Sequence, residues 1–156
     1  MSALDSITIK GFRSIRELEN FKLNSSVNLF IGANGAGKSN LISFFRLYNA
    51  FIEGYLPQYF RGYGEVSSHL YHGRKVTHNL CFETHFGIRG HRFEIHVTAE
   101  DKPAVFNEAR YYEPAASPWW SLSSMGDMQS LIAEEAKGDG LNAECSKPVY
   151  DAIKSW

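Results

Sequence analysis

The sequence predicts an α/β fold, and three observations support this prediction. A glycine-rich loop joins an apolar, strand-like run at residues 27–31 to a helix-like run that begins near Lys38. Apolar and polar residues then alternate across residues 80–97, which is typical of antiparallel strands with one buried face. A segment rich in Ser, Pro and Gly follows, with two short helix-like stretches. We therefore expect one lobe at residues 1–113 and a region of loop and two short helices at residues 114–156.

Local patterns define the N-terminal elements. Residues 7–15 alternate and then break at Gly11, which predicts a strand that runs into a turn. Phe21 and Leu23 predict a second short strand, and a polar turn at residues 24–26 comes next. The apolar run after that turn is nearly continuous, as in a parallel-sheet strand that is buried on both faces.

The helix after the loop and the sheet that follows it have the clearest periodicities. Gly54 and Pro57 are expected to end the helix. Its apolar residues recur at three- and four-residue steps: Leu41, Phe44, Phe45, Tyr48, Phe51 and Ile52. Antiparallel strands are expected at residues 80–86, 93–97 and 104–112, with a turn at residues 87–90. The last two helices are expected at about residues 127–137 and after Ser146 and Pro148.

Length, composition and charge narrow the class of protein. The 156 residues are enough for one domain with a substantial core. A formal net charge of −1 provides no basic field that would attract nucleic acid to this chain alone. Cys81 and Cys145 form no C-x-x-C pair, so neither a disulfide framework nor a zinc site is indicated. No stretch has transmembrane length or a signal-peptide pattern, so we expect a cytoplasmic protein without a membrane partner.

The loop is the strongest functional signal in the chain. Residues 32–39 read G-A-N-G-A-G-K-S and match the phosphate-binding pattern G-x-x-x-x-G-K-[ST]. Glycines let backbone N–H groups wrap an anion, and the next helix directs its N-terminal N–H groups at the same place. A turn that only joins a strand to a helix would not need the adjacent Lys and Ser. We expect Lys38 to reach the β- and γ-phosphates of ATP and the Ser39 hydroxyl to ligate Mg²⁺, with backbone contacts from Gly32, Gly35, Ala36 and Gly37.

The opening I-T-I-K-G-F-R-S-I and the loop G-A-N-G-A-G-K-S-N-L resemble the N-terminus of ABC-type ATPases of the SMC, RecF and OLD-nuclease group. The resemblance is closest to bacterial "AAA family" ATPases of that kind, several of which act in DNA repair or phage defence. It implies a P-loop ATPase lobe with an antiparallel meander. It also implies that the Phe-Arg-Ser turn lies beside the nucleotide, so that Arg13 contacts a phosphate or the adenine side, and that Asn34 and Asn40 contact the nucleotide from the loop. Residues 70–75, L-Y-H-G-R-K, also look like a segment of such proteins.

Full-length members of this group have a second half, with a signature motif, a strand that ends in Asp-Glu and a switch histidine. Residues 131–135 contain three apolar residues in a polar, helix-like window, so we do not interpret them as that strand. Residues 122–126 look only faintly like the signature motif and are better interpreted as a Ser-rich loop. We therefore expect an incomplete ATPase, the N-terminal part of a larger one, with no catalytic residues of its own and negligible ATP turnover.

This interpretation has a consequence for the run at residues 27–31. In the ABC arrangement that strand pairs with the Asp-Glu strand, so here an unpaired apolar edge is expected. We expect the chain to be marginally stable, to form a homodimer, or to depend on a complementing ATPase half. Residues 149–156 are the best candidate to fold back over the edge. DNA is expected as a partner only of the intact parent protein.

Other interpretations are weaker. A truncated or degenerate module could bind nucleotide without turnover. A small P-loop kinase needs a helical lid with arginines, and the arginines here are scattered over a strand-rich region.

His85 and His96 are expected on one face of a hairpin but not opposite one another, so solvated strand residues are a better interpretation than metal ligands. Trp119 and Trp120 are interpreted as packing beneath a long loop.

Overall fold

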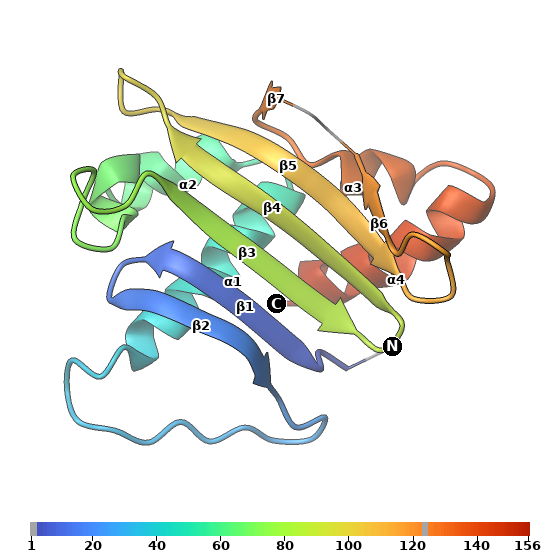
Figure 1. Cartoon of the computed structure of the whole chain (residues 1–156), viewed down its shortest axis with the longest axis horizontal. Helices are drawn as coiled ribbons and strands as arrows, with labels where there is room; N and C mark the ends of the chain where they lie inside the picture. Colours follow the sequence, from blue (N-terminus) through green and yellow to red (C-terminus); the bar gives the residue numbers. More distant parts are fainter. Residues whose placement is uncertain (1–2, 123–124) are drawn as a thin grey trace.

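One antiparallel sheet organises the described part of the chain, residues 3–122 and 125–156 of a computed structural model. Seven strands form this sheet, in the order β2-β1-β3-β4-β5-β6, with β7 also paired to β5. The helices lie on one face of the sheet and leave the other face open (Figure 1). The strands are β1 (Ser6–Phe12), β2 (Ile15–Lys22), β3 (Asn79–Phe86), β4 (Arg89–Val97), β5 (Pro103–Tyr112), β6 (Trp119–Ser121) and β7 (Met125–Asp127).

Helix α1 crosses the covered face of this sheet (Figure 1). It is followed by α2, by the short 3₁₀ helix η1 and, after the sheet, by α3 and α4. Among the described residues, no helix has the length and hydrophobicity that crossing a membrane requires. The helices are α1 (Lys38–Ile52), α2 (Leu56–Tyr63), η1 (Val66–His69), α3 (Leu131–Glu135) and α4 (Leu141–Lys154).

The core lies between α1 and the sheet, and it is rich in aromatic side chains. On β3 and β4 alternate residues are buried, as the period-two pattern predicts. Phe51 of α1 lies 4.2 Å from Phe93 of β4 between ring centroids, and Tyr48 lies 4.8 Å from the same ring. Each fully buried aromatic side chain contributes about 1.5–3 kcal/mol. The predicted helix and the predicted antiparallel meander are therefore both confirmed.

The predicted strand at residues 27–31 is wrong. This segment lies in an extended stretch outside the sheet, between β2 and α1 (Figure 1). Val27 is 77% exposed, Leu29 80% and Ile31 86%. A strand needs a neighbour for its N–H and C=O groups. Among the described strands none pairs with this segment, although β2 lies at the edge of the sheet and pairs only with β1.

The C-terminal helices also differ from the prediction. Helix α4 begins at Leu141, seven residues before Pro148, and encloses that proline. The proline removes one helical hydrogen bond, but the helix still buries an apolar side against α1 and the sheet through Val149, Ala152 and Ile153. The preceding helix, α3, is shorter than predicted. Helix α2 and strands β6 and β7 were not predicted.

The end of the chain folds back onto the core, although it does not pair with residues 27–31. The Asn49 side chain of α1 donates a hydrogen bond of 3.1 Å to the Ile153 carbonyl. The Trp156 ring lies 4.9 Å from Phe45 and 5.8 Å from Tyr48. Residues 149–156 therefore cover one end of the aromatic core rather than the open edge.

A buried polar network links four elements, β5, α3, β4 and α1, across this core. The Glu108 carboxylate of β5 accepts a hydrogen bond of 2.5 Å from Ser130 and one of 3.0 Å from the Leu131 N–H at the start of α3. It also lies 3.1 Å from Nε2 of His91, whose Nδ1 is 2.9 Å from the Tyr48 hydroxyl on α1. Burial raises the pKa of Glu108, but the His91, Ser130 and Leu131 contacts outweigh it and lower the pKa below its usual 4.5. This stabilisation is present above that usual pKa and is lost as the pH falls through the lowered value.

We expect Glu108→Ala to lower the free energy of unfolding by about 2–4 kcal/mol, because it leaves buried donors without an acceptor. Urea unfolding at neutral pH measures this loss. Glu100→Ala is the matched control, because Glu100 pairs with Lys102 on the surface and its loss should cost less than about 0.5 kcal/mol. Equal losses for the two variants would contradict a stabilising role for the network.

Candidate functional site

The glycine-rich loop ends in a backbone conformation that prepares the start of α1. Gly37 is the N-cap residue and has φ of 91°, in the left-handed region that favours glycine. Within this described segment, no side chain caps the helix and no acidic residue lies in its first turn. The orphan N–H groups and the positive end of the helix dipole are therefore available to an anion.

Lys38 is folded over the loop. Its ammonium group donates hydrogen bonds to the carbonyl oxygens of Gly32, at 2.5 Å, and of Ala33, at 2.8 Å. The Ala36 N–H also donates to the Ala33 carbonyl, at 3.2 Å. The cation therefore lies on the inside of the loop, where a phosphate group would exchange these neutral acceptors for charged ones.

The other expected loop contacts are solvent-accessible. Asn34, Gly35 and Ala36 are exposed, and Ser39 is exposed at the first turn of α1. The Ser39 carbonyl accepts a hydrogen bond of 2.9 Å from the Ser43 hydroxyl. In the parts of the chain that the structure describes, no group of three or more His, Cys, Asp or Glu residues is placed to hold a metal ion.

The turn between β1 and β2 packs against the start of α1. Asn40 donates a hydrogen bond of 2.6 Å to the Ser14 hydroxyl, and a Cβ added at Gly37 would lie 3.2 Å from that oxygen. Arg13 donates a hydrogen bond of 3.3 Å to the Ser43 hydroxyl. The structure thus brings Arg13 and Asn40, two residues 27 positions apart in the sequence, to the same side of the loop.

The backbone of Arg13 is strained, with φ of 53° in a residue that is not glycine. The N–H of Arg13 donates a hydrogen bond of 2.7 Å to the carbonyl of His69. The Arg13 guanidinium lies 2.9 Å from Nε2 of the same residue. Sequence reasoning did not connect His69 with this turn, because nothing local to either residue indicates a contact over 56 positions.

Residues 70–75, which had no assigned chemical role, tie the turn to the sheet. Leu70 forms an isolated antiparallel bridge with Phe12, and the Tyr71 N–H donates 2.8 Å to the Gly11 carbonyl. At the other end, Arg74 donates hydrogen bonds to the carbonyls of Val97, at 3.4 Å, and Thr98. The segment therefore braces the β1–β2 turn against the end of β4.

The two segments that were rejected above as parts of a second ATPase half are residues 131–135 and 122–126. Residues 131–135 form helix α3, which agrees with their exclusion as a catalytic strand. Glu135 accepts hydrogen bonds from Arg110 at 2.8 Å and from Ser146 at 2.6 Å, so it joins β5 to α4. Of residues 122–126, Ser123 and Ser124 lie outside the described residues.

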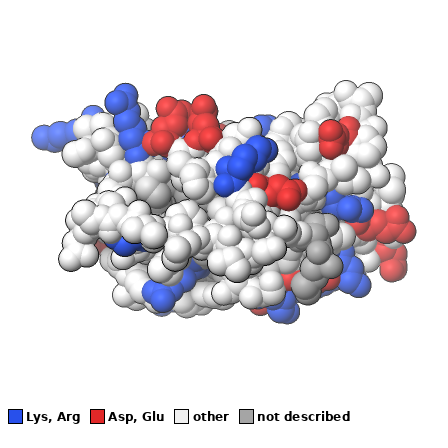
Figure 2. Space-filling view, turned by 90° about the horizontal axis from the view of Figure 1, so that it is seen from below, with Lys and Arg blue, Asp and Glu red and all other residues white. Residues whose placement is uncertain are grey.

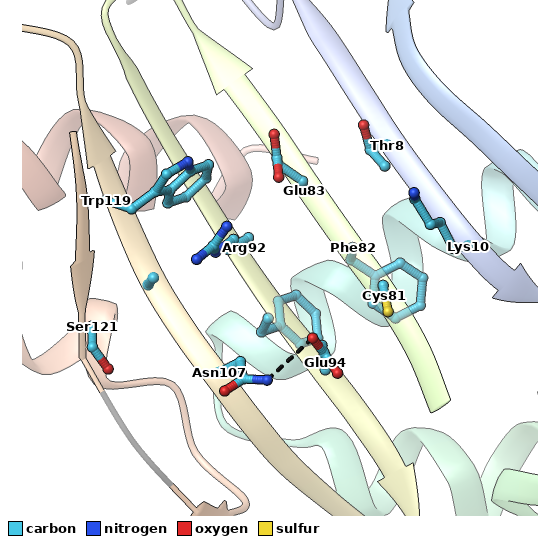
Figure 3. Close-up of a pocket in the computed structure, with 12 residues that line it drawn as sticks. Thr8, Lys10, Cys81, Phe82, Glu83, Arg92, Glu94, Asn107, Trp119 and Ser121 are labelled. Carbon is cyan, nitrogen blue, oxygen red and sulfur yellow. Dashed lines mark hydrogen bonds between the residues drawn. The ribbon is translucent and has the colours of Figure 1, made fainter. Parts of the chain in front are cut away.

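A hollow of about 460 Å³ lies on the open face of the sheet (Figure 3). The Arg92 guanidinium lies 4.2 Å from the ring centre of Trp119, and Asn107 donates a hydrogen bond of 3.2 Å to Glu94. Trp119 thus packs on a strand side chain rather than beneath a long loop, while its neighbour Trp120 is half exposed. Hydrogen-bond partners are already present for His85 and His96, the two histidines considered above as metal ligands: Glu83 for His85 and Glu94 for His96.

Charge is unevenly distributed around the molecule. Residues 23–37 contain no Asp, Glu, Lys or Arg. Figure 2 shows the molecule from below, with acidic and basic groups interspersed and a broad area that carries neither. No continuous basic patch is visible on this face, so the loop itself has to supply the attraction for an anion through N–H groups and Lys38.

The comparison with protein families agrees with this geometry. A family described as an AAA domain matches residues 6–51. These residues comprise β1, β2, the glycine-rich loop and nearly all of α1, which are the elements that build the site. The match supports an AAA-type ATPase domain, a nucleotide-binding module, in this part of the chain. No curated protein matches the chain.

We expect Gly37→Ala to lower the free energy of unfolding by about 1–2 kcal/mol, because an alanine at φ of 91° is strained and would crowd Ser14. Gly62→Ala is the control, since Gly62 lies in α2 with open space around it and without a positive φ. That substitution should be neutral or stabilising. A Gly37→Ala variant as stable as the wild type would show that the left-handed N-cap is not required.

Proposed function

We propose that this chain binds ATP with Mg²⁺ as the nucleotide-binding lobe of an ATPase similar to the ABC, SMC and RecF group. The observation that carries the proposal is the loop of residues 32–39, in which the left-handed Gly37 is the N-cap of a 15-residue helix and the Lys38 ammonium lies over the loop carbonyls. The matched family covers the same residues.

Each loop residue has a defined part in this proposal. The phosphates accept hydrogen bonds from loop N–H groups and the first turn of α1, and the Lys38 ammonium turns from the loop carbonyls to the β- and γ-phosphates. The exposed Ser39 hydroxyl provides the protein ligand to Mg²⁺. Arg13 and Asn40 flank the site from the β1–β2 turn side.

The proposal extends to the complete ATPase. Resemblance to the SMC, RecF and OLD-nuclease group supports a role in DNA repair or phage defence, with DNA as a partner of the intact parent. Hydrolysis requires a positioned water and further charged groups around the phosphates, and in that group these come from a second half. We therefore propose a module that holds nucleotide and turns it over only when that half is present. The alternative is a module that binds nucleotide without any turnover.

The exposed segment at residues 27–31 supports a complementing partner. Val27, Leu29 and Ile31 alternate along the segment, and each of them is more than three-quarters exposed. An exposed apolar strand is stabilised when another strand pairs with its N–H and C=O groups and its apolar side chains are covered. We propose that an apolar strand from the complementing half pairs here and fixes the loop that follows.

The direct test of ATP binding is the Lys38→Ala variant. We expect it to bind Mg–ATP at least tenfold more weakly in calorimetric titration, because charge-assisted hydrogen bonds to the phosphates contribute about 1.5–3 kcal/mol. Mg–ATP should also raise the melting temperature of the wild type and not of the variant.

Lys137→Ala is the matched control, because Lys137 is an exposed lysine beyond α3. It should bind Mg–ATP as the wild type does. Equal affinity for ATP in Lys38→Ala and Lys137→Ala would refute the assignment of the loop.

The exposed segment has its own test. We expect the wild-type chain to bind a dye specific for apolar surfaces and to self-associate in light scattering, since an unpaired apolar segment is a template for association. The double variant Leu29→Lys, Ile31→Lys should lose most of both signals. Val76→Lys is the control, because Val76 is an exposed apolar residue of another segment. A wild type that stays monomeric and binds no dye would contradict the proposal.

A further inference from the structure

His69 contacts the strained Arg13 at two points. Its backbone carbonyl accepts from the Arg13 N–H at 2.7 Å, and its Nε2 atom lies 2.9 Å from the guanidinium. The same guanidinium donates to Ser43, which in turn donates to the Ser39 carbonyl on the first turn of α1. A chain of contacts thus runs from His69 through Arg13 to the loop end of the helix.

The partners of the His69 ring define a single tautomer. The Glu65 carbonyl, 3.1 Å from Nδ1, can only accept a hydrogen bond, so Nδ1 carries the proton. Ser68 lies 3.3 Å from the same atom but donates its own proton to the Glu65 carbonyl at 2.6 Å. The Arg13 guanidinium can only donate, so Nε2 must present its lone pair. Both contacts are therefore made by neutral His69 with the proton on Nδ1.

The surroundings of the ring favour this neutral form. His69 is fully buried, between the rings of Phe12 from β1 and Tyr59 and Phe60 from α2. Burial lowers the pKa of His69, and the Arg13 charge lowers it further, although the hydrogen bond to Glu65 acts in the opposite direction. The titratable groups that face the ring are Arg13 and Tyr59, whose own pKa is raised by burial.

We propose that His69 is a positioning residue for Arg13, which it holds against the first turns of α1 so that the guanidinium faces the bound nucleotide. This inference rests on the proposed ATP binding. Without an acceptor at Nε2, the contacts that would still orient the guanidinium among the described residues are the hydrogen bond of 3.3 Å to Ser43 and the Phe12 ring, whose centre lies 5.6 Å away. An arginine that rotates freely loses side-chain entropy when it contacts the nucleotide. An arginine that His69 already holds has lost this entropy beforehand, so it binds the nucleotide at a lower entropic cost.

Four variants of the 156-residue chain test this role by calorimetric titration with Mg–ATP. His69→Phe keeps an aromatic ring between Phe12 and Phe60 but removes the acceptor, and we expect about fivefold weaker binding. Arg13→Gln should weaken binding at least as much. The double variant should bind no more weakly than Arg13→Gln alone, because His69 acts through Arg13. His69→Gln offers a side-chain oxygen near the Nε2 position and should restore most of the affinity.

Either of two outcomes overturns the inference. In the first, His69→Phe binds Mg–ATP as tightly as the wild type. In the second, His69→Phe weakens Mg–ATP binding by the same factor in the Arg13→Gln background as it does in the wild type. Melting temperatures without ATP show whether each variant is folded. If His69→Phe does not fold, nitrogen NMR of the wild type replaces it. A proton on Nδ1 and a bare Nε2 are expected, and a proton on Nε2 overturns the inference.

Lys38→Ala in the same experiment separates this inference from the proposed function. If wild type and Lys38→Ala bind ATP equally or not at all, the proposed function itself fails. If Lys38→Ala loses ATP while His69→Phe and Arg13→Gln retain it, the loop binds nucleotide and only the role of His69 fails.

Discussion

The packing of α1 across the antiparallel sheet is the contact on which the rest of the structure depends. One side of this helix supplies Phe44, Tyr48 and Phe51 to the core, where they meet Phe82 and Phe93. The N-terminus of the same helix forms the end of the phosphate loop. An isolated helix of this length is marginal in water, so tertiary packing has to hold the N–H groups that would face a phosphate. The core and the candidate site are therefore coupled through a single element.

Much of the fold could be predicted because its main elements carry strong periodicities. The alternation in β3 and β4 and the apolar stripe of α1 report burial directly, since each residue's face follows from its position. The segment at residues 27–31 has the composition of a buried strand, yet composition does not supply the partner that a strand requires. Helix α4 could not be delimited for a related reason, because burial of Val149 and Ile153 outweighs the helix-breaking tendency of Pro148.

In the candidate site, too, the parts that are local in the sequence could be predicted and the contacts between distant segments could not. The loop from Gly32 to Ser39 is contiguous, so its pattern could be recognised from the sequence alone. The resemblance of the opening segment predicts that Arg13 lies beside the nucleotide, and this stays a prediction. His69 could not be found this way, because its contacts with Arg13 arise from the way η1 packs beside the β1–β2 turn. Nothing in the spacing of the six histidines distinguishes it from the solvated ones on the hairpin.

Amide NMR during titration with Mg–ATP tests the central claim, that the loop is the nucleotide site, most directly. The account predicts that the largest shifts occur at the backbone N–H groups of residues 35–40, with smaller shifts at the turn that contains Arg13. Largest shifts around Arg92 and Trp119 on the open face of the sheet (Figure 3), or no shifts at a saturating concentration, would contradict it.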